Sequence, residues 1–277
     1  MTDAVTPPEP ETPGAEPTKE SWWETVRFIL FLFLAALVLR TFLLAPFSIP
    51  SGSMLPRLMI GDYLFVSKWS YGYSRFSLPF QPIDFSGRFL GGVPARGDVV
   101  VFRHPNGGDD LVKRVIGLPG DTIELRQGVV ILNGRPLPRE AIADYAMGVS
   151  PNSPCVPKYG SVTRRGRDEN GELVCLFPRF RETLPDGPSY DVLDQTPSSE
   201  TDNFGPIRVP QGHVFVMGDN RDDSADSRVP AIVGGVGFLP IDNILGKVVF
   251  TFWSTDGSAS WIKPWTWFTA ARWSRLG

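Results

Sequence analysis

The chain is organised around residues 48–56, Ser48-Ile49-Pro50-Ser51-Gly52-Ser53-Met54-Leu55-Pro56, which follow directly on its longest apolar run. Pro50 and Pro56 lack amide donors and push the residues before them toward extended conformations, so this segment cannot continue a helix. Gly52 can adopt backbone dihedrals that are closed to other residues. The pattern therefore predicts a constrained turn at Ser53. Such a turn is either a plain connector or a means of holding a serine hydroxyl beside free backbone N–H groups, as a nucleophile and an oxyanion hole require.

The apolar run before this turn predicts one membrane helix. Counted from Trp22 to Leu44, with Arg27 and Arg40 able to extend their charges toward water, it reaches the length of about 20 residues that a span needs. A cleaved signal peptide would begin with a basic segment and end at small residues, and neither is present. Residues 1–21 are rich in proline and acidic side chains and are expected to be a disordered tail. We therefore expect a helix at 22–44 and a folded domain at 45–277.

Short runs of β-branched and aromatic residues between turns predict that the domain is mainly β. The 28 glycines and 27 prolines supply the turns that such a fold needs. The expected strands lie at 61–69, 97–103, 110–117, 214–217 and 248–253. Residues from about 136 to 210 are polar and rich in turns, and we interpret them as an inserted, less regular lobe.

Charge and composition disfavour two classes of function. The net charge is −3 at pH 7 and the basic residues are scattered, so the chain offers no basic surface for a nucleic-acid backbone. The chain has two histidines and two cysteines without a Cys-x-x-Cys pair, and no metal or other cofactor is expected.

Lys113 has two interpretations. Strand alternation places it on one face with Leu111 and Val115, among apolar residues. It can be the exposed charge of an edge strand. Alternatively, it is a buried lysine whose pKa falls because its charged form is desolvated, which leaves an amine able to accept a proton.

Three motifs in order resemble those of the type I signal peptidases, membrane-bound serine proteases that remove signal peptides from exported proteins. They are Ser48-Ile49-Pro50-Ser51-Gly52-Ser53-Met54 with Ile60-Gly61-Asp62, then Arg96-Gly97-Asp98-Val99-Val100-Val101-Phe102 with Lys113-Arg114-Val115-Ile116-Gly117-Leu118-Pro119-Gly120-Asp121, and finally Gly218-Asp219-Asn220-Arg221-Asp222-Asp223-Ser224-Ala225-Asp226-Ser227-Arg228. The lysine of the second motif falls on Lys113, which favours the buried interpretation.

The resemblance implies a mainly β, antiparallel catalytic domain of the signal-peptidase and LexA-like type, with an inserted lobe. It implies a single-pass protein of the bacterial inner (plasma) membrane, with a cytoplasmic tail at 1–21 and an extracytoplasmic peptidase domain. Its partners would be exported preproteins and the lipid bilayer, and its substrates would carry small residues before the cut. In that compartment, Cys155 and Cys175 are expected to form a disulfide, which would support the lobe rather than the reacting residues.

The resemblance also implies the roles of the site residues. Ser53 would be the nucleophile and Lys113 the general base. The Ser51 hydroxyl and the Ser53 N–H would form the oxyanion hole, and Ser224 would orient the lysine amine. Ion pairs among Arg114, Asp219, Asp226 and Arg228 would brace the site, and shallow apolar pockets would be lined by Ile49, Pro50, Met54, Leu58, Leu111 and Val112.

Other interpretations predict different chemistry. A Ser-His-Asp triad would have to use His104 or His213, and neither has a supporting motif. A catalytically silent, membrane-tethered peptide-binding protein could use the same fold. The chain also departs from the family pattern at residues 229–238, a longer segment than we expect after the third motif.

Overall fold

The computed structural model describes residues 22–77, 85–158, 160–260 and 262–277, and these form two units, residues 1–38 and 39–277. The tail expected at 1–21 lies outside the described residues. Within the first unit, helix α1 spans Trp22–Val38 and buries none of its residues. With the π-helical turn Leu39–Leu43, it forms an apolar stretch long enough to cross a membrane. Leu44, expected to end the helix, instead begins strand β1, where it pairs with Ser67.

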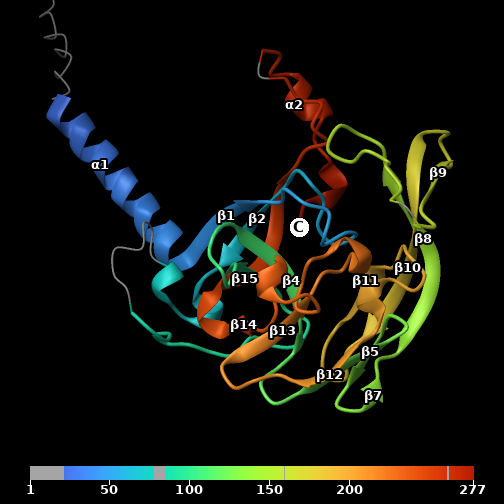
Figure 1. The fold of residues 1–277 in the computed structure, drawn as a ribbon. Coiled ribbons are helices and arrows are strands. Elements are labelled where there is room, and N and C mark those ends of the chain that lie inside the picture. Colours follow the sequence, from blue (N-terminus) through green and yellow to red (C-terminus); the bar gives the residue numbers. More distant parts are fainter. Residues whose placement is uncertain (1–21, 78–84, 159, 261) are drawn as a thin grey trace, which may run out of the picture. The chain divides into compact units, whose positions relative to one another are not determined.

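The second unit is built from three antiparallel sheets, as predicted (Figure 1). The largest has the order β1-β2-β15-β3-β4-β13-β14. Its strands are β1 (Leu44–Ser48), β2 (Asp62–Ser67), β3 (Val99–Arg103), β4 (Asp110–Gly117), β13 (His213–Met217), β14 (Leu239–Pro240) and β15 (Ile244–Ser254).

The other two sheets hold four strands each. One contains β8 (Arg139–Gly148), β9 (Arg164–Arg167), β10 (Leu173–Thr183) and β11 (Ser189–Leu193), and so fills much of the region expected to be a less regular lobe. The other contains β5 (Thr122–Arg126), β6 (Val129–Leu132), β7 (Arg135–Pro136) and β12 (Phe204–Arg208). A short helix, α2 (Thr266–Thr269), follows β15.

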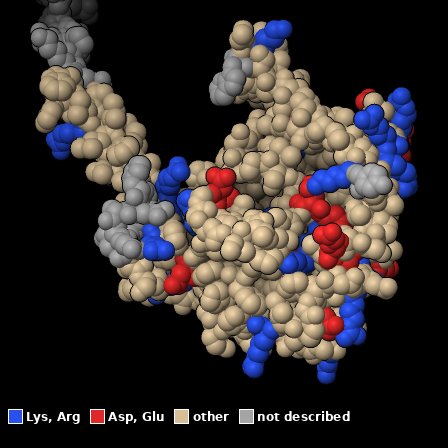
Figure 2. Space-filling model, in the orientation of Figure 1, with Lys and Arg blue, Asp and Glu red and all other residues tan. Residues whose placement is uncertain are grey.

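Basic side chains gather over β9, which pairs only with β10 (Figure 2). The strand carries Arg164, Arg165 and Arg167, all exposed. Charges on such an edge discourage pairing with another chain.

The sheets share apolar clusters that fix β4 from both sides. Ile116 of β4 and Phe215 of β13 are fully buried against Ile123 and Leu125 of the small sheet. On the opposite face of β4, Val115 packs with Val100 and Val216. Because β4 is held on two faces, its polar residues Lys113 and Arg114 are carried into the interior on a rigid element.

Candidate active site

The serine turn lies between β1 and β2 and is tied to the third motif. The backbone N–H of Asn220 donates to the Ser53 carbonyl at 3.0 Å, and the Asn220 side-chain amide donates to the Gly52 carbonyl at 3.0 Å. Ser53 itself is buried, with 7% of its surface exposed. Asn220 thus fixes the backbone on both sides of the peptide bond that precedes the serine.

Lys113 reaches Ser53 from β4. Its Nζ lies 2.6 Å from the Ser53 Oγ, although the two residues are 60 positions apart in the sequence. The lysine is 4% exposed, so the buried interpretation describes its position. This distance is within reach for direct proton transfer between the two groups.

Burial lowers the pKa of Lys113 from 10.5 to about 8, because its charged form loses water. The carboxylates of Asp226, Asp219 and Asp223 act in the opposite direction, and Arg228 reinforces the fall. Near pH 8, half of the lysine is therefore neutral and can accept a proton.

The groups expected to form an oxyanion hole lie beside the serine. The Ser51 hydroxyl is 3.4 Å from the Ser53 Oγ. Among the described residues, the Ser53 N–H donates to no protein acceptor. Both donors are therefore open toward a bound carbonyl oxygen.

Ser224 lies in the same neighbourhood, but the expected contact with the lysine amine is not formed. Its Oγ is buried and, within the described part of the chain, has no hydrogen-bond partner. Gly218 explains how it fits: a Cβ on Gly218 would lie 2.3 Å from the Ser224 Oγ and 2.6 Å from the Ser53 carbonyl oxygen. Only glycine lets the two strands of this site approach so closely.

Two of the expected ion pairs are present beneath the dyad. Arg114 donates to both carboxylate oxygens of Asp219, at 2.7 and 2.6 Å, and Arg228 to both oxygens of Asp226, at 2.9 Å each. Asp226 also accepts the N–H of Gly218 at 2.9 Å. Bidentate geometry of this kind fixes orientation as well as charge.

A third buried pair was not predicted. Arg221 binds both oxygens of Glu182, and the Tyr190 hydroxyl donates to the same carboxylate at 3.0 Å. Arg221 is within the third motif, but Glu182 lies in the region 136–210, where no motif is recognisable. Sequence alone therefore held a signal for only one partner.

The expected pocket residues are only partly brought together. Ile49, Met54 and Leu58 are buried in one cluster, against which Val112 packs. Leu111 packs in a different cluster and Pro50 is exposed. The largest cavity of the described residues, about 1110 Å³, is lined by Leu58 and Arg114 and includes neither Ser53 nor Lys113.

Neither histidine takes part. His104 Nε2 bonds to the Gly235 carbonyl and His213 Nδ1 to the Gln211 carbonyl. The longer segment 229–238 thus packs against His104.

Three carboxylates could attract a cation. Asp194, Asp202 and Asp222 each place one oxygen within 4.8 Å of the others. Arg139 pairs with Asp194, and the N–H groups of Gln195 and Thr196 donate to Asp222 at 2.6 and 2.9 Å. These acids already serve as acceptors for protein donors.

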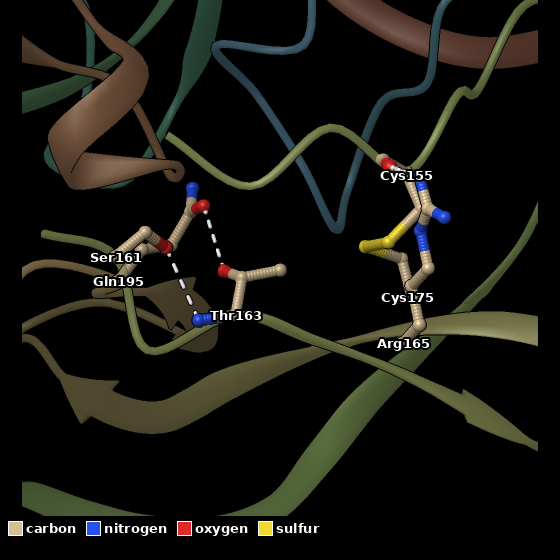
Figure 3. The surroundings of a disulfide bond; sticks show 6 residues. All are labelled: Cys155, Ser161, Thr163, Arg165, Cys175 and Gln195. Atoms are coloured by element: carbon tan, nitrogen blue, oxygen red, sulfur yellow. Dashed lines mark hydrogen bonds between the residues drawn. A yellow bond between two sulfur atoms is a disulfide. The ribbon is translucent and has the colours of Figure 1, made fainter. Parts of the chain in front are cut away.

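The Cys155–Cys175 disulfide is formed, and its surroundings differ from the expectation (Figure 3). Arg165 donates to the Cys155 carbonyl at 3.1 Å within the lobe. However, both cysteines are buried in the same apolar cluster as Leu55 and Met59. The disulfide therefore supports the segment that follows Ser53 as well as the lobe.

Asp62, which closes the first motif, is fully buried and held by distant residues. It accepts from the Ser254 hydroxyl at 2.6 Å and from Arg275 Nη2 at 2.7 Å. Arg272 donates to the Ile60 carbonyl at 2.5 Å. These arginines lie among tryptophans, which had suggested packing or a bilayer interface, and the sequence carried no signal that they reach the serine segment.

The comparisons with known proteins agree with this geometry. The family model described as "Signal peptidase, peptidase S26" matches residues 22–253. A signal peptidase I of Rickettsia typhi is 36% identical over 237 residues, which cover 81% of this chain and 78% of that protein. A signal peptidase I of Rickettsia akari is 35% identical over 249 residues, with 86% and 80% covered.

A crystal structure of a signal peptidase I from Enterococcus faecalis V583 is 22% identical, with a TM-score of 0.29, covering 56% of this chain and 97% of that one. The assignment rests on the sequence matches, which span most of the chain. It agrees with the resemblance drawn from the three motifs. The chain therefore belongs to the signal peptidase family, peptidase S26, and its enzyme class is that of a serine endopeptidase.

Proposed function

We propose that this protein is a membrane-anchored endopeptidase that cleaves signal peptides from exported preproteins with a dyad of Ser53 and Lys113. The observation that carries the proposal is the 2.6 Å contact between Lys113 Nζ and Ser53 Oγ. The pKa of about 8 for the same lysine supports it. The anchor would be the apolar stretch Trp22–Leu43, with the domain on the extracytoplasmic side of the bacterial plasma membrane.

The dyad would act in two proton transfers. Neutral Lys113 takes the proton of Ser53 as the Oγ attacks the scissile carbonyl, and the resulting ammonium then protonates the leaving amine. Developing negative charge on the carbonyl oxygen is stabilised by the Ser53 N–H and the Ser51 hydroxyl. Water attacks the acyl-enzyme in the second half of the reaction, with Lys113 again as the base.

The substrate pocket would select small side chains before the cut. Ile49, Met54 and Leu58 are tightly packed, and a pocket bounded by such residues rejects bulky groups sterically. We expect Ala to be preferred at the first and third positions before the scissile bond.

The test is cleavage of a fluorogenic signal-peptide substrate by the full chain. Ser53→Ala and Lys113→Met should both be inactive, and the double variant should be no worse than either single one, because the two groups act as a unit. Efficient turnover by a folded Lys113→Met protein would overturn the proposal. Turnover by the unmodified chain excludes the catalytically silent binding protein.

Lys68 provides a matched control. It too is buried, and burial, reinforced by Arg40, lowers its pKa to about 8. Its Nζ, however, donates to the Ser77 carbonyl at 2.6 Å and is not bonded to Ser53. Lys68→Met should retain cleavage, which separates the loss of a buried amine from the loss of the base.

A further inference from the structure

Phe89 and Leu90 form an exposed apolar ridge on a rigid backbone. They are 68% and 74% exposed. The preceding residue, Arg88, turns inward and donates to five backbone carbonyls at 2.8 to 3.3 Å, those of Tyr71, Gly72, Ile241, Asp242 and Ile244. One side chain thus ties the ridge to two separate parts of the domain.

The backbone of the ridge is held in an unusual conformation. Leu90 has φ 53°, in the left-handed region that a bulky residue seldom adopts. Phe89 exchanges two backbone hydrogen bonds with Tyr73, at 2.9 and 2.8 Å. Gly72 permits the approach, since a Cβ there would lie 2.4 Å from the carbonyl oxygens of Phe89 and Leu90. Strain of this kind persists where the surroundings over-determine it, and it is enriched at functional sites.

The ridge is joined to the end of the apolar stretch. The Tyr73 hydroxyl donates to the Phe42 carbonyl at 2.8 Å, and the two rings are 5.6 Å apart. Phe42 belongs to the turn Leu39–Leu43, the last residues of the stretch Trp22–Leu43. Wherever that stretch leaves a bilayer, Tyr73 and its partner Phe89 lie beside the exit.

We propose that Phe89 and Leu90 dock into the lipid bilayer beside the exit of the membrane span. The inference rests on the proposed membrane anchoring. An exposed apolar pair that continues a membrane span, with an aromatic ring at the water boundary, matches the chemistry of the acyl-chain and headgroup border. A second attachment point next to the span would restrict the rotation and height of the domain over the membrane.

Site-directed labelling of the full chain in liposomes tests this directly. The only two cysteines form the disulfide, so one introduced cysteine is the only free thiol. An environment-sensitive dye is attached at Leu90→Cys, at Leu34→Cys within α1, and at Glu169→Cys on an exposed turn of the lobe. Each sample is quenched separately with nitroxide-bearing lipid and with aqueous iodide.

The proposal expects position 90 to be quenched by the lipid and shielded from iodide, as position 34 is, with position 169 showing the reverse. Accessibility at 90 equal to that at 169, with 34 in the lipid, would overturn the ridge and leave the anchor intact. A label at 34 that iodide reaches would overturn the anchoring itself. Shielding at 90 that appears only at a high protein-to-lipid ratio would assign the ridge to contacts between copies, and would equally overturn the proposal.

A functional variant gives a second readout. Phe89→Ser with Leu90→Ser should cleave a soluble fluorogenic peptide at the normal rate, because neither residue belongs to the dyad. Cleavage of a preprotein embedded in liposomes should fall several-fold, since the domain is no longer held at a fixed height. Equal rates on both substrates, relative to the unmodified chain, would refute a docking role.

Discussion

Replacing Lys113 by methionine should abolish catalysis and yet stabilise the folded protein at neutral pH. Burial lowers the pKa of this lysine from 10.5 to about 8. An unfolded chain therefore holds the proton more tightly than the folded one between these two values, and stability must rise with pH across that window. At pH 7 the lysine costs the folded state about 3 kcal/mol, from roughly 2.5 pKa units at 1.36 kcal/mol each.

Methionine fills a similar space without a charge, so the variant should be more stable by an amount approaching this cost. The gain should be about 3 kcal/mol at pH 7, about 2 at pH 9 and below about 1 at pH 10, as the unfolded lysine also loses its proton. Lys113→Arg is the control, because a guanidinium remains charged throughout and should destabilise at every pH.

Chemical unfolding of the purified full chain in detergent, followed at the three pH values, measures these differences. The reasoning would be refuted by a methionine variant that is less stable than the original at pH 7. It would equally be refuted by a gain that stays constant between pH 7 and pH 10. In the unmodified enzyme, the acid limb of kcat/KM against pH should have its midpoint near the same pKa of about 8.

Three further changes probe the surroundings of the dyad. Asp223→Asn removes a carboxylate that raises the pKa of Lys113, so the acid limb should move to lower pH; a move to higher pH in the rate profile would contradict this. Glu182→Gln breaks the buried pair with Arg221 and should lower the unfolding free energy by about 3–5 kcal/mol, measured by denaturant titration, and an unchanged midpoint would argue against the pair. Leu55→Ala removes a side chain packed beside the disulfide and should cost about 2–5 kcal/mol while lowering kcat more than it raises KM, whereas loss of stability at unchanged kcat would limit the cluster to a structural role.

The fold class could be predicted because local chemistry repeats it many times. Runs such as Val99–Arg103 and Val214–Met217 favour strands by composition, and both became buried strands of the large sheet. The end of the membrane helix was placed one residue too far, because pairing of Leu44 with Ser67 overrides the apolar pattern. Pairing of this kind depends on a distant strand and leaves no local trace.

The reacting residues were accessible to sequence reasoning only through motif order. Alternation put Lys113 on an apolar face, but it could not choose between solvent and interior, and 60 positions separate it from Ser53. Glu182 and Arg275 were missed because each is one charged residue in a segment without a pattern, and their partners lie elsewhere in the chain. The pocket was over-predicted, since Leu111 faces a different cluster from Met54.

The bond between Arg275 and Asp62 has a consequence for the birth of the enzyme. The two residues are 213 positions apart, and Asp62 is fully buried in the segment that follows Ser53. At translation rates of about 5–20 residues per second, the carboxylate waits roughly 10 to 40 seconds for its arginine. Until then a buried charge would stand unpaired, which disfavours closure of the serine segment. The nascent protein is therefore timed to remain without activity until residue 275 has been made and delivered, so that no half-built protease is released among the preproteins leaving the same ribosomes.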